Sequence, residues 1–563
     1  MAPGNDNFEV QTMKDGRWVT EAARDRKAEA LKLAENFLNN NQCEGARIVA
    51  NKTYRDGSIK EDVIFEKTQN AANKPVRITP IEETPRWCKS TRGFFTLESR
   101  MIMSRIFRNY LESVTLTPTE VLHKEADIRR LYDSDNLMPS AVNMVAKLQV
   151  KGTDKRPKER QDEIYAIVDQ IVDQAAWAES LDLPALSDPF SETLADLARI
   201  EAERPEYLAM VVLARDLANH ANWVGKIDRL CDLATAETDN KAVLLLDTVI
   251  ADALSANVVQ ELLGWQPSLD SAIIGMLDLA DGKFDPEQSD AEETVERLNP
   301  LFTAEVLPAS KRVLIDRALR QLKSTQPLNR TEPDKEMEEY QRILARLLVP
   351  GGILSGAAAA EAITLRGARF VEQGGATGRK AAINATVKVL PDKARGVMYL
   401  AELSNTELVA DHADDIVEQL DIVFSARVID ELCRRSMSPK ARMVTATGAF
   451  QATVSSALPD DVKERVADHI DGVLERYLTD EQIIDKLDNP DTPLRDRAVR
   501  LVKFCSAGVL PEGKALNMAR KRIVQILRQP NFDENFIDGI NDPSRAEAAL
   551  RGFHQMLVDA GFA

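Results

Sequence analysis

The chain has 563 residues, 44% of them hydrophobic and 29% charged, and its formal net charge is −18. This length allows more than one folding unit, and the composition is typical of an ordinary soluble protein rather than a disordered or membrane protein. The acidic balance argues against general nucleic-acid binding, which needs Lys and Arg to neutralise phosphates. The first 100 residues carry a small positive excess, so the acidic character belongs to the rest of the chain.

Two further features suggest the compartment. No apolar run is long enough to cross a bilayer, and the first residues lack a basic region followed by an apolar stretch. The five cysteines are odd in number, widely spread and never in CxxC spacing, so we expect reduced thiols. These features together predict a cytoplasmic protein.

The chain begins with two predicted β-hairpins separated by one helix. Residues 8–13 and 18–22 have strand character and flank an Asp-Gly pair, and residues 46–54 and 59–67 flank a second such pair. Asp-Gly supplies the positive φ angles that a tight hairpin turn requires. Apolar residues recur at helical spacing through 24–39. The sequence therefore predicts a small α+β module of order ββαββ, interpreted as a docking domain, with a ligand sensor as the alternative.

A polar, proline-bearing stretch over residues 68–85 follows and is interpreted as a flexible linker. Residues 86–108 are then basic and aromatic, as in segments that stack on bases or enter interfaces. Apolar residues at helical spacing also fit the first helix of a core, with a solvated basic face. The sequence leaves open a solvated face, a protein contact and a nucleic-acid contact. The candidate interaction residues are Arg86, Trp87, Lys89, Arg92, Phe94 and Phe95.

The rest of the chain contains repeated signals for the start of a helix, in which Ser, Thr or Asp precedes a proline. Thr117 and Glu120 form a complete capping-box pattern. The other cap–proline pairs are Asp188-Pro189, Asp285-Pro286, Ser438-Pro439, Thr492-Pro493 and Asp542-Pro543. No fixed-period repeat accompanies them. We therefore expect a mainly α protein whose small N-terminal module precedes a large irregular helical array, solenoid-like or bundle-like.

The predicted domain boundaries follow from these patterns and from a charged, proline-bearing stretch that separates two helical parts. The expected parts are an α+β module at 1–67, a linker at 68–85, a helical domain at 86–324, a second linker at 325–341 and a second helical domain at 342–563.

A glycine-rich run at 374–380 resembles a phosphate-binding loop at first sight. It lacks the spacing of a P-loop, and Ala381 replaces the Ser or Thr that should follow the lysine. The only anion site it suggests is a set of four cations, Arg366, Arg369, Arg379 and Lys380.

Other clusters of acidic residues and histidines also lack part of the pattern that a metal or catalytic site requires. Asp414, Asp415 and Glu418 share a helix face, but no second acidic motif completes a magnesium site. The five histidines lack zinc-ligand spacing. We therefore expect no catalytic residue, metal or cofactor. A basic stripe at Arg520, Lys521 and Arg522 is a further candidate contact for a partner or a second subunit.

The leading hypothesis is a non-enzymatic interaction or scaffold protein, in bacterial signalling or assembly, whose helical body binds a protein partner or another copy. The absence of a compact polar cluster is typical of helical arrays, which bind through extended surfaces. The alternative is a regulatory protein or enzyme that binds a nucleotide or another small anion through the four cations named above.

Overall fold

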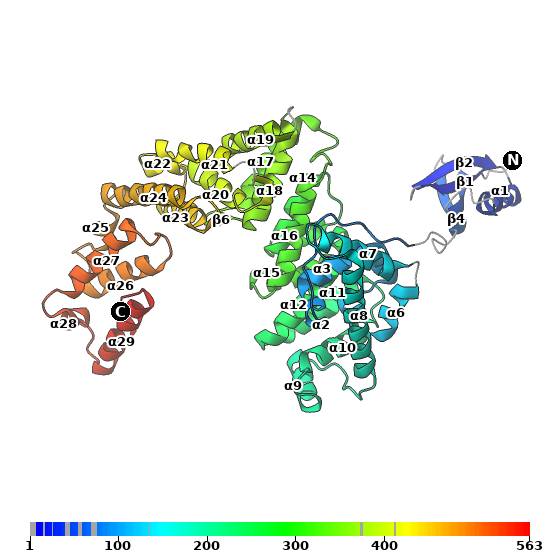
Figure 1. Cartoon of the computed structure of the whole chain (residues 1–563), viewed down its shortest axis with the longest axis horizontal. Helices are drawn as coiled ribbons and strands as arrows, with labels where there is room; N and C mark the ends of the chain where they lie inside the picture. Colours follow the sequence, from blue (N-terminus) through cyan, green and yellow to red (C-terminus); the bar gives the residue numbers. More distant parts are fainter. Residues whose placement is uncertain are drawn as a thin grey trace. The chain divides into compact units, whose positions relative to one another are not determined.

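The computed structural model describes residues 7–14, 17–24, 26–39, 45–53, 59–68, 76–133, 136–371, 375–409 and 413–562. These residues form 29 α-helices, a four-stranded sheet and a two-stranded hairpin. The chain divides into two compact units, Met1–Asp182 and Leu183–Ala563. Figure 1 shows the strands of the four-stranded sheet at the beginning of the chain and mostly helices in the rest, with β6 of the hairpin among them. The predicted fold class is confirmed.

The N-terminal module has the predicted order of elements. They are β1 (Asn7–Lys14), β2 (Arg17–Arg24), α1 (Lys27–Asn39), β3 (Gly45–Thr53) and β4 (Ile59–Thr68). The sheet is antiparallel throughout, in the order β2-β1-β3-β4. Val10, Ala46 and Ile48 form its core with Ala30 and Ala34 of α1, whose small side chains allow the helix to lie close to the sheet. Both predicted Asp-Gly turns lie outside the described residues.

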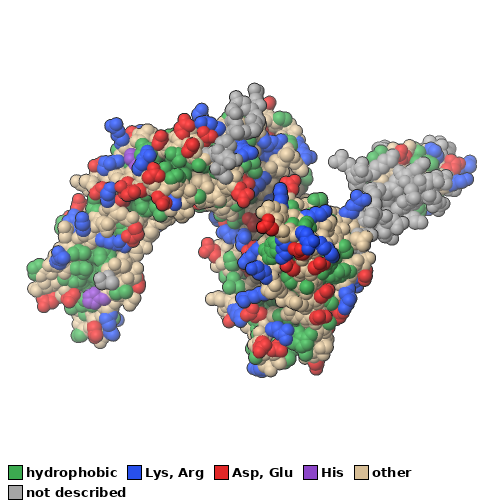
Figure 2. All heavy atoms as spheres, in the orientation of Figure 1, with side chains coloured by type: hydrophobic (Ala, Val, Ile, Leu, Met, Phe, Trp, Pro, Cys, Tyr) green, Lys and Arg blue, Asp and Glu red, His purple; other side chains and the backbone are tan. Residues whose placement is uncertain are grey.

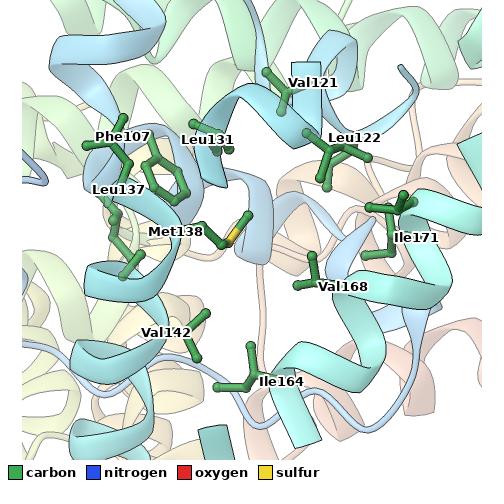
Figure 3. Packing of buried hydrophobic residues seen from close by; sticks show 14 of the residues in the cluster. Phe107, Val121, Leu122, Leu131, Leu137, Met138, Val142, Ile164, Val168 and Ile171 are labelled. Carbon is green, nitrogen blue, oxygen red and sulfur yellow. The ribbon is translucent and has the colours of Figure 1, made fainter. Parts of the chain in front are cut away.

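The first unit continues with seven helices in its described residues. They are α2 (Thr91–Phe94), α3 (Leu97–Ile106), α4 (Arg108–Val114), α5 (Pro118–Leu122), α6 (Glu125–Asp133), α7 (Leu137–Val150) and α8 (Pro157–Glu179). Their apolar faces meet in one core, part of which Figure 3 shows. Leu131 and Ala146 are fully buried there. This core gives the short helices α2 to α6 the tertiary support that isolated short helices lack.

The segment that precedes α2 packs against these helices. Val76, Ile78 and Ile81 contact the core, and the Thr79 amide donates to the Ile106 carbonyl at 2.8 Å. These residues belong to the stretch interpreted as a linker, 68–85. Its residues 69–75 lie outside the described part of the chain. The later part of this stretch is thus a packed element of the first unit.

The second unit is built from helices of moderate length. The first group comprises α9 (Phe190–Ile200), α10 (Pro205–Leu217), α11 (Trp223–Ala236), α12 (Asn240–Leu254), α13 (Val258–Leu263), α14 (Leu269–Ala280), α15 (Glu292–Thr303), α16 (Pro308–Lys323), α17 (Glu336–Leu347) and α18 (Gly356–Gly367). The second group comprises α19 (Gly375–Val389), α20 (Lys393–Leu403), α21 (Ala413–Leu420), α22 (Ile429–Leu432), α23 (Pro439–Ser455), α24 (Asp460–Asp480), α25 (Ile483–Leu487), α26 (Leu494–Ser506), α27 (Lys514–Leu527), α28 (Phe532–Phe536) and α29 (Pro543–Asp559).

Shorter elements join these helices. They are the 3-10 turns η2 (Pro286–Gln288), η3 (Pro333–Lys335), η4 (Ala368–Phe370), η5 (Glu407–Val409) and η6 (Asp421–Ser425), and the hairpin of β5 (Leu348–Val349) and β6 (Gly352–Ile353).

The helices of the second unit stack in an irregular succession. α12 and α14 both pack on α16, α16 packs on α18, α18 on α20, α20 on α23, α23 on α24 and α24 on α27. Each helix therefore buries its apolar face mainly against near neighbours along the stack, as in helical arrays.

Side chains from distant helices cap several helix ends in this stack. The Asp247 carboxylate of α12 accepts from the amides of Ala309 and Ser310 at 2.6 and 2.9 Å, where α16 begins. The Asp471 carboxylate of α24 likewise accepts from the amides of Lys514 and Ala515 at 2.6 and 3.1 Å, where α27 begins. Both caps satisfy amides that a helix start leaves without intrahelical partners.

The stretch 325–341, interpreted as a linker, lies within the second unit. Leu328 is fully buried, and its carbonyl accepts from the amides of Leu269 and Asp270 at 2.8 and 3.3 Å, at the beginning of α14. The stretch also includes η3 and the first turns of α17. The division of the helical region into two domains at this stretch stays a prediction.

Candidate functional site

The aromatic residues of the basic segment contact the core of the first unit. Phe94 and Phe95 pack against its apolar cluster. Trp87 lies under two cations, with Arg160 Cζ at 4.3 Å and Lys155 Nζ at 5.1 Å from its ring centroid. Its ring face therefore already has cationic partners within the chain.

A buried polar network holds the backbone of this segment in place. Arg160 is 1% exposed, and its guanidinium donates to the Cys88 carbonyl at 3.0 Å and to the Gln149 side chain at 2.7 Å. The Gln149 amide donates in turn to the carbonyls of Pro85 and Arg86 at 3.2 and 2.8 Å. The network fixes the segment to α7 and α8, and it leaves the side chains of Arg86, Lys89 and Arg92 exposed.

The four cations of the predicted anion site already form hydrogen bonds or ion pairs within the chain. Arg366 is fully buried, and its guanidinium donates to four carbonyls at the end of α16. Arg369 donates to two of the same carbonyls from the surface, and Arg379 donates to the Leu408 carbonyl at 3.4 Å. Lys380 Nζ pairs with Asp415 and Glu418 at 2.7 and 3.0 Å.

These contacts account for two sequence features at once. The acidic cluster that resembled half of a magnesium site neutralises Lys380, and that pairing raises the pKa of Lys380. Residues 372–374 of the glycine-rich run lie outside the described part of the chain, and Gly375 begins α19.

No group of three or more His, Cys, Asp and Glu side chains that could hold a metal ion occurs among the described residues. His123 is buried with Nδ1 at 2.7 Å from the Thr119 carbonyl, and burial lowers its pKa to about 4. His469 lies in α24 with Nε2 at 2.8 Å from the Ala426 carbonyl. Both rings are thus bonded to backbone, while His412 lies outside the described residues.

The basic stripe on α27 is also partly occupied. Arg520 forms a bidentate pair with Glu512, at 2.7 and 2.8 Å. Arg522 pairs with Asp485 and lies 3.4 Å from Asp488. Lys521 is exposed. On the face shown in Figure 2, acidic and basic side chains are interspersed, as these pairs require.

The sequence patterns missed Trp265, in the turn between α13 and α14. It is 81% exposed, more than any other large hydrophobic side chain among the described residues. Gly264 has a φ of 60°, and a Cβ on it would lie 2.1 Å from the Gln288 carbonyl oxygen, so only glycine fits there. The Gln266 side chain donates to the Leu263 carbonyl at 2.7 Å and closes the turn.

The turn that carries Trp265 packs beside an acidic loop. The Asp290 amide donates to the Glu261 carbonyl at 3.0 Å, and the Ser289 hydroxyl donates to the same carbonyl at 3.3 Å. The stretch 242–296 contains a single basic residue, Lys283, which lies 3.7 Å from Asp281. Its exposed carboxylates are Glu261, Asp285, Glu287, Asp290, Glu292, Glu293 and Glu296. We call Trp265 together with these carboxylates the Trp265 surface.

Two hollows at the surface lack the groups of a catalytic site. One of about 370 Å³ in the first unit is lined by Arg129, Tyr132, Val172 and three aspartates, and burial raises the pKa of Tyr132 to about 12. Another, of about 700 Å³, is an open depression beside α15. Neither brings a nucleophile together with a base.

Comparison of the chain with family models, with curated proteins and with solved structures gives no match. None of the helices in the described ranges has the length and apolar character needed to span a membrane.

Proposed function

We propose that this chain is a non-enzymatic protein-binding scaffold and that the Trp265 surface is its principal anchor for a partner. The observation that carries the proposal is the 81% exposure of Trp265 on a turn fixed by Gly264 and Gln266. Tryptophan is enriched among the residues that dominate binding at protein interfaces. A turn whose backbone is fixed before binding lowers the entropy that association would cost.

The surrounding charge favours a particular kind of partner. The stretch 242–296, which carries the turn, exposes seven carboxylates, and its only cation, Lys283, lies 3.7 Å from Asp281. A partner that presents arginine or lysine beside an apolar contact would stack a cation on the indole and pair with the carboxylates. We place this activity in the cytoplasm, in an assembly or signalling complex, with the N-terminal module as a second docking point.

Arg366 and Lys380 each already have partners within the chain, and this supports the scaffold proposal over the binding of a small anion. An incoming anion would have to displace the helix-end carbonyls from Arg366 and the carboxylates from Lys380. The scaffold proposal requires no such rearrangement.

The test is affinity capture of the tagged full-length chain from its native lysate, with co-purifying proteins quantified. Trp265→Ala is compared with Leu244→Ala, which removes a side chain that is also exposed, by 50%, on α12. Loss of a central aromatic anchor costs about 2 kcal/mol or more, or roughly a 30-fold weaker complex. We expect a stoichiometric partner that is lost with Trp265→Ala and retained with Leu244→Ala. Equal recovery with both variants would contradict the proposal.

A further inference from the structure

A buried carboxyl group lies where α14, α17 and the 325–336 stretch meet. Glu339 of α17 is 5% exposed, and its Oε1 accepts from the Asn329 side-chain amide at 2.6 Å. Its Oε2 is buried and has no hydrogen-bond partner among the described residues. An ionised carboxylate with an unpaired buried oxygen is costly, whereas protonation removes the charge and supplies a donor.

Charged groups face Glu339 from each neighbouring element. Asp270 of α14 is fully buried, and its Oδ2 lies 3.1 Å from Arg342 Nη1 of α17. Glu336 of α17 accepts from the amides of Leu328 and Asn329 at 2.8 and 3.2 Å, and it lies 3.6 Å from Arg366 of α18. Lys335 of η3 also interacts with Glu339, but its Nζ lies 2.9 Å from Glu332. Each of these three cations is therefore paired with an acid other than Glu339.

We infer that Glu339 is a proton-operated latch for the junction of α14, α17 and the 325–336 stretch. In its protonated form Glu339 is neutral beside Asp270 and keeps Asn329 and its loop closed against α17. Ionisation places a second negative charge beside Asp270, and opening of the 325–336 stretch relieves the repulsion by hydrating both carboxylates.

The direction of the pH effect follows from burial and from the neighbouring charges. Burial is the largest effect and, with the charges of Asp270 and Glu336, raises the pKa of Glu339 above its ordinary 4.5 against the opposing hydrogen bond from Asn329 and the charge of Arg342. A raised pKa in the closed state means that the latch holds fully below about pH 4.5 and weakens as the pH rises through the raised value. Each pH unit over which only the open state is ionised changes the opening constant by about tenfold.

The latch also bears on the Trp265 surface, because Asp270 lies only five positions after Trp265, at the start of the helix that the Trp265 turn leads into. Opening of the junction would loosen the support of that turn. This consequence rests on the proposed function, but the latch itself does not, so the two can fail separately.

The experiment is hydrogen exchange by mass spectrometry on the full-length chain between pH 5 and 8, corrected for the intrinsic pH dependence of exchange. Peptides that cover 326–336 report the latch directly. Glu339→Gln imitates the protonated form and keeps an acceptor for Asn329. Glu338→Gln removes the charge of the adjacent exposed residue and is the matched control.

We expect wild type and Glu338→Gln to lose protection in 326–336 as the pH rises, and Glu339→Gln to keep the same protection throughout. Asp270→Asn should reduce the pH dependence, because it removes the neighbouring charge. Protection of the wild type that does not change with pH would overturn the inference, even if a variant fails to fold. Retention of the wild-type pH dependence by Glu339→Gln would also overturn it.

Discussion

Replacement of Arg366 by alanine is the sharpest test of how the second unit is held together. Arg366 is fully buried in α18, and its guanidinium closes the end of α16. Nε donates to the Leu322 carbonyl at 2.8 Å, Nη1 to the Gln326 carbonyl at 2.7 Å, and Nη2 to the carbonyls of Ser324 and Gln321 at 3.0 and 3.3 Å. One side chain thus joins two helices and the beginning of the 325–341 stretch.

The expected loss follows from what the substitution leaves behind. Hydrogen bonds from a charged donor contribute about 1.5–3 kcal/mol each, but water entering the vacated space would satisfy some of the carbonyls. The cavity and the carbonyls that remain unpaired leave a net cost of about 3–5 kcal/mol. Arg366→Lys should recover only part of this, because an ammonium group cannot reach four carbonyls with the geometry of a guanidinium.

Arg369→Ala is the matched control, since Arg369 donates to two of the same carbonyls from an exposed position. Its loss should cost less than about 1 kcal/mol. The assay is urea unfolding followed by far-ultraviolet circular dichroism, with the midpoints of the variants compared at a common slope. Equal midpoints for Arg366→Ala and Arg369→Ala would refute the claim that the buried guanidinium closes the end of α16.

Substitutions at three further positions test the first unit by the same unfolding assay. Thr117→Ala removes the buried capping box that Thr117 forms with Glu120, and it should lower the free energy of unfolding by about 1–2 kcal/mol. Thr117→Ser keeps the hydroxyl and should cost less. Equal losses for the two variants would contradict a stabilising role of this cap. Trp87→Ala should cost about 2–3 kcal/mol through lost packing under Arg160, and a neutral result would mean that the indole does not support the buried guanidinium. The pKa of His123 is lowered to about 4 from 6.5, so the unfolded state takes up the proton first and up to about 3 kcal/mol of stability is lost as the pH falls from 6.5 to 4. His123→Gln should remove that component, and a wild-type pH profile for this variant would refute it.

The sequence predicts correctly those elements that depend on residues close together in the chain. Runs of strand character on either side of two Asp-Gly pairs, with apolar residues at helical spacing through 24–39, are enough to give the order of β1, β2, α1, β3 and β4. The caps at Thr117, Ser438 and Asp542 are confirmed, because each depends only on the next two or three amides. At Asp188 and Thr492 the helix begins after the proline and lacks a side-chain cap, so the cap–proline pattern alone places the helix start imperfectly.

Contacts between distant residues could not be found in this way. The partners of Arg366 lie 40 to 45 positions away along the chain, and nothing in the 366–380 stretch shows that its cations are occupied. Trp265 has a local signal, since it follows a glycine and precedes Pro267 outside any helical pattern. Its exposure depends on how α13, α14 and the acidic loop pack around the turn, which the local sequence does not show.

The measurement that tests the central claim most directly is site-specific photocrosslinking in the native cell, with a photoreactive amino acid at position 265 and, as control, at position 244. A residue that anchors a partner lies within crosslinking distance of it, whereas position 244 is exposed but outside the Trp265 surface. The account predicts a discrete crosslinked adduct with one protein at position 265 and none at position 244. No adduct at position 265, or the same adducts at both positions, would contradict the proposal that the Trp265 surface binds a partner.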